Sequence, residues 1–306
     1  MGLLFLFVLE AGNSAQFSNL THQINLTPVS VVRKRVLFFR DAEAIFSSPD
    51  TLWEMLDFVN SKNVSTLVVN FPYIYMGDEE QEAFLAERVN LMSQKGLKTC
   101  QLLSFDENYN YTSAIGKFLK YNRNCYYRNE PNTAFSGAVL NGDSLLFTLK
   151  NDTQKVAFLR YFKELKDDLK EEQESSLGKF KVPQFYVAFS YPNLKAYSGK
   201  KVKFMGLKAP FFQHLMEISD GVLVFTRKEN AGAVGSEVGD MLANSGMRKK
   251  PFWIIVVLTQ KSKLFKMGLQ ELESLIKNEW WDYMKDYQNF SGFGFYPYEV
   301  YRYIED

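Results

Sequence analysis

The sequence predicts an α/β fold, and three features of the chain indicate it. From Arg35 onward, apolar runs rich in β-forming residues alternate with amphipathic helical stretches, which is the pattern of βα units around a parallel sheet. Eight such units fit a single barrel of roughly 250 residues. The last apolar run, Phe-Ser-Gly-Phe-Gly-Phe at 290–295, interleaves small and aromatic residues, as a barrel-closing strand requires. We therefore predict a (β/α)8 TIM barrel over 35–306, with an open doubly wound sheet as the alternative.

Each strand is predicted from one short apolar run. Pro183 is tolerated only where its strand starts, and the run at 252–258 is apolar enough to be buried on both faces. Residues 200–206 predict an additional, irregular strand. The expected barrel strands are 35–40, 66–71, 97–105, 135–140, 182–189, 221–225, 252–258 and 290–295.

The helices are predicted from the stretches between these runs. Asp50 supplies a carboxylate to the first turn of one helix, and Gly96 ends another. The run of Lys, Asp and Glu at 163–174 is typical of a solvated helix face. The expected helices are 49–60, 79–94, 113–121, 153–174, 210–218, a short one ending near 244, 267–287 and a last short one.

Composition excludes several classes of function. A net charge of +1 with evenly mixed signs does not favour a nucleic-acid partner. No Gly-rich phosphate motif is present, so no nucleotide cofactor is expected. His22 and His214 are the only histidines, which disfavours a Ser/His/Asp site and a zinc site. The aromatic share of 16% fits a carbohydrate site, because rings stack on sugar C–H faces, or a coding bias.

The N-terminal region predicts a secreted or luminal protein. Residues 1–34 are interpreted as a leader and extension, with an apolar run at 1–9 of signal-peptide length that is too short to span a bilayer. Asn-X-Ser/Thr acceptors for glycosylation are more frequent than the roughly two expected by chance. They are Asn19, Asn25, Asn63, Asn110, Asn151 and Asn289.

The only two cysteines are Cys100 and Cys125. In an oxidising compartment they are expected to form a disulfide. The alternative is a pair of reduced, buried thiols.

Four stretches resemble glycosidase-like TIM barrels of secreted or bacterial proteins. They are 135–143, 214–227, 269–275 and 290–298. The resemblance implies a barrel whose fourth strand carries acidic catalytic residues. This chain departs from that pattern at strand four, where Asn141 stands in place of the usual Asp and Asp143, which is shorter than Glu, holds the next carboxylate position. It also departs at strand seven, which ends in Leu-Thr-Gln instead of Glu.

Candidate site residues lie at the carboxyl ends of the predicted strands, where barrels place their chemistry. Glycoside hydrolysis needs two carboxyl groups, and Asp143 is the first candidate, with Asp106, Glu107 or Glu229 as its partner. Each carboxylate is alternatively a solvated loop residue or a helix N-cap. The predicted lining residues for substrate are Arg40, Tyr73, Asn141, Arg227, Tyr296 and Tyr298.

Three functional hypotheses remain open on the sequence. The first is an active glycosidase that uses Asp143 and a second carboxylate. The second is a carbohydrate-binding or structural descendant with degenerate catalytic carboxylates. The third is a secreted interaction or assembly protein without a sugar site. The missing acid of strand seven and the presence of Asn141 favour the second hypothesis.

Overall fold

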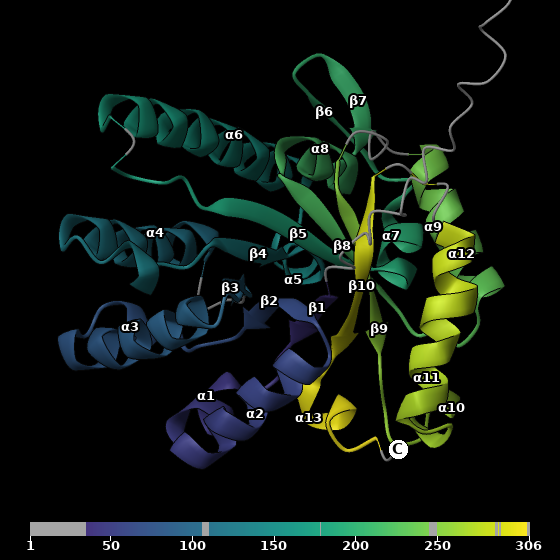
Figure 1. Ribbon diagram of the computed structural model, residues 1–306. Helices are drawn as coiled ribbons and strands as arrows, with labels where there is room; N and C mark the ends of the chain where they lie inside the picture. Colours follow the sequence, from purple (N-terminus) through teal and green to yellow (C-terminus); the bar gives the residue numbers. More distant parts are fainter. Residues whose placement is uncertain are drawn as a thin grey trace, which may run out of the picture. The chain divides into compact units, whose positions relative to one another are not determined.

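The barrel predicted from the sequence is confirmed in a computed structural model of the chain, which describes residues 35–105, 110–177, 179–244, 250–284, 287 and 289–304. Eight parallel strands close in the order β1-β10-β9-β8-β5-β4-β3-β2 (Figure 1), so the open-sheet alternative is wrong. The barrel strands are β1 Arg35–Phe38, β2 Val64–Val69, β3 Lys98–Leu103, β4 Gly137–Asn141, β5 Gln184–Ser190, β8 Gly221–Thr226, β9 Phe252–Val257 and β10 Phe290–Tyr296.

The barrel closes where β10 pairs with β1 on one side and β9 on the other. Gly294 lies opposite Val36 in this pairing. A Cβ atom on Gly294 would stand 2.4 Å from the backbone oxygen of Val36 and 2.6 Å from the side chain of Ile255. The small residue of the closing strand therefore permits the contact between the first and last strands.

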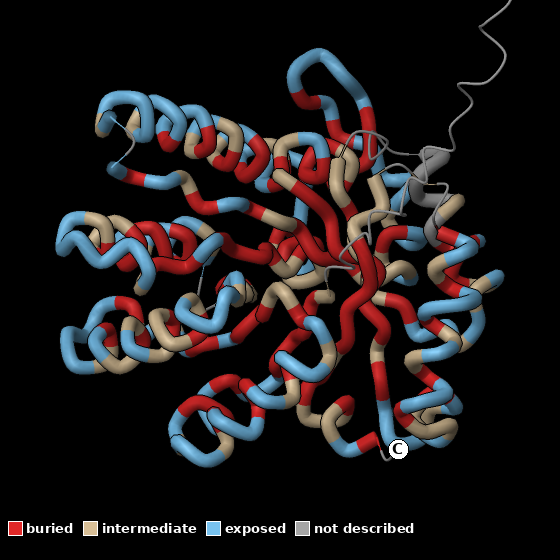
Figure 2. Tube along the Cα trace, in the orientation of Figure 1, coloured by how far each residue is buried: buried red, intermediate tan, exposed pale blue. Residues whose placement is uncertain are grey.

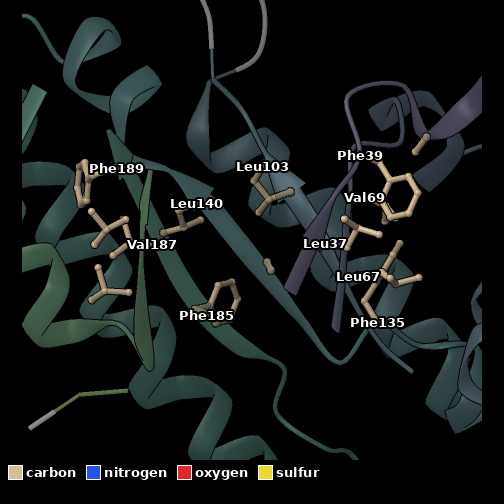
Figure 3. Close-up of a cluster of buried hydrophobic side chains, with 14 of the residues drawn as sticks. Leu37, Phe39, Leu67, Val69, Leu103, Phe135, Leu140, Phe185, Val187 and Phe189 are labelled. Carbon is tan, nitrogen blue, oxygen red and sulfur yellow. The ribbon is translucent and has the colours of Figure 1, made fainter. Parts of the chain in front are cut away.

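Alternate residues of each strand face two separate cores. Val36, Phe38, Val68 and Cys100 belong to a cluster that fills the barrel interior. Their neighbours, such as Leu37, belong to a larger cluster with the covering helices. Figure 3 shows side chains of this outer cluster, and Figure 2 shows the buried strands surrounded by helices with exposed outer faces. The period-two alternation thus divides each strand between barrel interior and helix layer.

The helices follow the predicted order but differ in length. The helix expected at 113–121 extends over 111–127, and the one expected at 267–287 is divided by a π-helical turn at Ile276–Trp280. Short helices at the ends of β1, β4 and β5 were not predicted. Among the described residues, no helix is both long and apolar enough to cross a membrane. The α-helices are α1 Ala42–Ser47, α2 Pro49–Ser61, α3 Glu79–Gln94, α4 Tyr111–Tyr127, α5 Gly142–Thr148, α6 Asp152–Ser175, α7 Tyr191–Tyr197, α8 Phe211–Ile218, α9 Ala231–Asn244, α10 Lys263–Lys266, α11 Leu269–Leu275, α12 Trp281–Met284 and α13 Tyr298–Tyr301.

The irregular strand expected at 200–206 is one arm of a β-hairpin. Its strands are β6 Lys201–Phe204 and β7 Leu207–Pro210, which pair antiparallel outside the barrel (Figure 1). Met205 and Gly206, both at positive φ (48° and 82°), form the turn.

The predicted disulfide is wrong, because both cysteines are free and buried. Cys100 belongs to the cluster inside the barrel, whereas Cys125 lies on α4 in the outer cluster. The wall of the barrel separates the two thiols. Burial raises the pKa of Cys100 to about 12, so this thiol stays protonated at neutral pH.

Candidate functional site at the mouth of the barrel

A cavity of about 620 Å³ opens at the carboxyl ends of the strands. Its walls come from β1, β3, β4, β5, β8, β9 and β10 and from the segments that follow them. This is the end of the barrel at which side chains from many strands converge. The lining residues are Phe38, Leu102, Asn141, Asp143, Ala188, Ser190, Pro192, Phe225, Arg227, Lys228, Glu237, Val257 and Tyr296.

The end of β4 places Asn141 and Asp143 in this wall. The carboxamide oxygen of Asn141 accepts the Ser144 N–H (3.1 Å) and so caps helix α5, while its Nδ2 donates to Ser104 Oγ (3.2 Å). The first turn of α5 carries Asp143, whose two carboxylate oxygens share the Ser190 N–H at 3.2 and 3.1 Å. The cap fixes the helix start, and the helix start positions the carboxylate between β4 and β5.

A glycine allows α5 to lie this close to β5. A Cβ atom on Gly142 would stand 2.2 Å from the ring of Phe189. The sequence Asn-Gly-Asp at 141–143 therefore combines a helix cap, a close approach and a carboxylate directed to the mouth.

The second carboxylate of the cavity belongs to Glu237, in the second turn of α9. The Thr226 hydroxyl donates to Glu237 Oε2 (2.8 Å), and Lys228 Nζ lies 3.7 Å from Oε1. The Lys228 N–H donates in turn to Thr226 Oγ1 (3.0 Å). Glu237, which is only 9% exposed, is therefore held by the end of β8.

Sequence reasoning missed both Glu237 and Lys228. Glu237 lies in the helix after β8, whereas the predicted residues come from the ends of strands, and Lys228 lies between the predicted Arg227 and Glu229. The available signal was helical spacing: Glu237 follows Val234 by one turn and shares its buried side of α9.

Three aromatic rings contribute to the apolar part of the cavity wall. Phe38, Phe225 and Tyr296 pack edge-to-face in a triangle, with centroid separations of 5.0, 6.3 and 5.8 Å. All three also belong to or pack against the cluster of the barrel interior. They therefore close the top of that core and face the cavity.

Three further predicted residues, Glu229, Tyr73 and Arg40, lie outside the cavity lining. Glu229 accepts the N–H of Lys263 at the start of α10 (2.7 Å), and Tyr73 donates its hydroxyl to the Ser104 carbonyl (2.6 Å). Arg40 is exposed, and its N–H donates to Glu299. Asp106 and Glu107 lie outside the described residues.

Tyr298 is a correction to the sequence prediction. It is 1% exposed and packs against Phe39 and Phe58, with ring centroids 4.9 and 5.6 Å apart. It belongs to α13, which follows the last strand and packs into the helix layer. Its side chain is therefore part of the outer core, whereas Tyr296, two residues earlier, lines the cavity.

No group of three or more His, Cys, Asp and Glu side chains that could hold a metal ion occurs in the parts of the chain that the structure describes.

The fold and the position of the cavity define the chain as a (β/α)8 barrel with a candidate ligand site at its mouth. No protein-family model matches the sequence, and no curated protein matches it. Among solved structures, the chain is similar to Sph3 from Aspergillus clavatus in complex with GalNAc (TM-score 0.51, 13% identity, 90% of this chain and 94% of that chain). It is also similar to the ICChI chitinase from Ipomoea carnea (TM-score 0.50, 10% identity, 88% and 96%). At these identities the similarity concerns the fold.

Proposed function

We propose that the mouth of the barrel binds carbohydrate. The observation that carries the proposal is the composition of the cavity wall, where the rings of Phe225 and Tyr296 stand beside Asn141, Asp143 and Arg227. Apolar ring faces pack on the C–H faces of a sugar, and amide, carboxylate and guanidinium groups bind its hydroxyls. A volume of about 620 Å³ is within the range of small-molecule sites. The two barrels of similar fold, one a chitinase and one bound to GalNAc, support this choice of ligand.

Polar groups at the mouth remain available to a ligand. Within the described residues, neither the Tyr296 hydroxyl nor the Arg227 side chain has a hydrogen-bond or ion-pair partner. Asp143 accepts only one N–H across its two oxygens, although a carboxylate has about four lone-pair sites. The wall therefore offers a donor, an acceptor and a hydroxyl around the aromatic surface.

Active glycoside hydrolysis is the second candidate, because Asp143 and Glu237 are two carboxylates on one cavity and hydrolysis uses such a pair. Both are held as acceptors: Asp143 by the Ser190 N–H, and Glu237 by Thr226 and Lys228. A general acid must donate a proton, whereas in the described part of the chain both carboxylates take part in hydrogen bonds only as acceptors. We therefore favour a binding role with degenerate catalytic carboxylates.

The binding proposal is tested by a glycan array with the purified protein, followed by titration of the best glycan. Replacing Tyr296 with alanine removes one ring face and is expected to weaken binding about tenfold, which corresponds to about 1.4 kcal/mol. Tyr127→Ala is the matched control, because Tyr127 is 77% exposed on α4 and should leave affinity unchanged. Equal affinity of the wild type and Tyr296→Ala would refute binding at the mouth.

Asp143→Asn separates binding from hydrolysis. The amide keeps an oxygen that can accept the Ser190 N–H, so the variant is expected to fold and to retain most of its affinity. If the wild type releases reducing ends and Asp143→Asn does not, the chain is a hydrolase. If both proteins bind without releasing product, the binding role holds.

We further propose that the chain is a secreted glycoprotein, on the strength of its acceptor sequons. Asn63, Asn110 and Asn151 are exposed. Asn110 and Asn151 cap helices through their carboxamide oxygens, which leaves the nitrogen that carries an N-glycan free of that contact. Asn19 and Asn25 lie outside the described residues, and Asn289 is half-buried.

Expression in a glycosylating secretory host tests this proposal. Enzymatic deglycosylation is expected to reduce the mass of the product, and Asn151→Asp, which keeps the capping oxygen and removes the acceptor nitrogen, should remove one glycan without loss of stability. A product that is secreted but has the unmodified mass would contradict glycosylation.

A further inference from the structure

The β6–β7 hairpin packs against the outside of the barrel through its inner side. Val202, Phe204 and Ala209 on its inner side are buried. His214 of α8 lies beneath it: its Nε2 is 3.2 Å from the Val202 carbonyl, and its ring packs edge-to-face on Phe204 with centroids 5.6 Å apart. The base of the hairpin is therefore part of the fold, and its tip projects beyond α8 (Figure 1).

The tip of the hairpin exposes apolar side chains. Met205, in the turn, is 71% exposed and Leu207 is 48% exposed. Met205 also occupies a left-handed conformation (φ 48°) that Asn or Gly adopts more readily. Neither its exposure nor its backbone conformation explains a methionine at this position.

The outer face of the hairpin is basic. Lys201, Lys203 and Lys208 are exposed, and Lys203 stands directly opposite Lys208 in the register. Like charges at opposed positions destabilise a strand pair. Among the described residues, no carboxylate pairs with any of these three lysines. The hairpin therefore carries an uncompensated positive charge that does not help it fold.

A groove of about 560 Å³ lies beside the tip and continues this basic surface. Met205 and Leu207 share it with lysines of α6 and with Lys250. Its carboxylates are Asp167, Glu217 and Asp220, of which Asp167 pairs with Lys163 and Asp220 with Lys166. Lys170 and Lys250 remain against one further carboxylate, Glu217, so the groove carries a small net positive charge. Lys250 also donates to the Ser219 carbonyl (2.8 Å).

The groove also locates the tip relative to the mouth. Asp220 immediately precedes β8, and Lys250 precedes β9, so the groove and the tip lie toward the amino ends of the strands. The cavity lies at their carboxyl ends. A surface that the tip contacts would leave the mouth facing away from it.

We propose that the β6–β7 hairpin docks this protein on an anionic lipid surface, with Met205 and Leu207 entering the interface and Lys201, Lys203 and Lys208 contacting acidic headgroups. The apolar side chains are at the extreme tip, where they would reach the acyl chains of the lipids. The lysines flank the tip, where they would meet the charged headgroups above those chains. An anionic polysaccharide fits less well, because its sugar rings would be bound by exposed aromatic side chains and the tip, residues 203–208, has none beyond the buried Phe204.

The experiment is co-sedimentation of the full chain with vesicles of phosphatidylcholine alone or mixed with phosphatidylserine. The wild type is expected to bind the acidic vesicles selectively, and less strongly as salt shortens the Debye length below about 8 Å.

Lys203→Gln with Lys208→Gln should weaken binding about 25-fold, at about fivefold for each lysine. Met205→Asn should weaken it about tenfold while creating an Asn-Gly turn that favours the hairpin, so lost binding cannot be attributed to unfolding.

The matched control is Lys120→Gln with Lys261→Gln, which removes the same charge from exposed positions on other parts of the surface. It should bind as the wild type does. Equal binding of the wild type to both vesicle types, unchanged binding of the hairpin variants, or retention on an acidic polysaccharide with none on vesicles would each overturn the proposal. Tyr296→Ala should still bind vesicles, which separates this test from the carbohydrate test.

Discussion

Replacing Gly294 with alanine is expected to lower the free energy of unfolding by about 3 kcal/mol, the upper part of the range for overpacking a core. The added Cβ would stand 2.4 Å from the Val36 oxygen and 2.6 Å from Ile255. The first contact is with backbone, which cannot rotate away. Because Val36 and Gly294 join the first and last strands, the strain falls on the closure of the barrel. Urea denaturation followed by circular dichroism measures the loss.

Gly116→Ala is the matched control for this substitution. Gly116 lies in the exposed middle of α4, and nothing stands within 4 Å of the position its Cβ would take. Alanine there should stabilise the protein by about 0.5–1 kcal/mol. It lowers the conformational entropy of the unfolded chain, and it has a higher helix propensity than glycine. If the two variants changed stability equally, close approach at Gly294 would not be the reason for its glycine.

Replacing Glu273 with glutamine is expected to cost about 2–3 kcal/mol. Glu273 of α11 binds the guanidinium of Arg35, the first residue of β1, through both oxygens and accepts the Tyr301 hydroxyl (2.6 Å). The Arg35 and Glu273 side chains are only 18% and 24% exposed. Removing one partner of a fully buried pair costs roughly 3–5 kcal/mol, and partial exposure reduces that figure. Thermal or urea unfolding at neutral pH measures it.

The same contact makes stability depend on pH. Burial alone would raise the pKa of Glu273, but the Arg35 hydrogen bonds and charge, together with Tyr301, hold that pKa below its ordinary value. Burial beside Glu273 raises the pKa of Tyr301, so its hydroxyl remains a donor. The ionised Glu273 carboxylate stabilises the fold at pH values above its pKa in the unfolded chain, which is about 4.3. This stabilisation is lost as the pH falls through the lower pKa that the carboxyl group has in the folded protein.

Acid unfolding therefore distinguishes the wild type from Glu273→Gln. The difference in stability between them should be constant near neutrality and shrink below about pH 4.3. Glu271→Gln is the control, since Glu271 is an exposed residue of the same helix and should change stability by less than about 0.5 kcal/mol. A constant difference down to the lowest pH would contradict the proposed role of the Glu273 charge.

The barrel could be predicted because its signal is repeated along the chain. Each buried strand is a short apolar run followed by a helix, so an error of two residues at one end of β2 or β3 does not change the topology. The short helices α1, α5 and α7 lack such a signal, and only the first strand of the β6–β7 hairpin was predicted. The position of α5, for example, depends on packing against an element distant in the sequence, as the close approach of Gly142 to Phe189 of β5 shows.

The candidate site was only partly predictable for a related reason. Asn141 and Tyr296 end strands, and Asp143 and Arg227 come within two residues of a strand end. The structure places all four around one cavity. Glu237 reaches the same cavity from within a helix, and only its contacts with Thr226 and Lys228 reveal it. The opposite error concerns Tyr298, which was predicted to line the site but is buried in the outer core against Phe39 and Phe58.

The cysteine prediction was wrong because sequence separation does not show which side of a strand a side chain faces. Cys100 points into the barrel and Cys125 packs outside it. A one-residue change of register would place Cys100 on the helix side.

The most direct measurement of the central claim is a crystal structure of the protein with the best-bound glycan. We expect a sugar ring in the cavity, stacked against Phe225 or Tyr296 and hydrogen-bonded to Asp143, Asn141 or Arg227. A glycan bound elsewhere, with the mouth left empty, would contradict a carbohydrate site at the carboxyl ends of the strands.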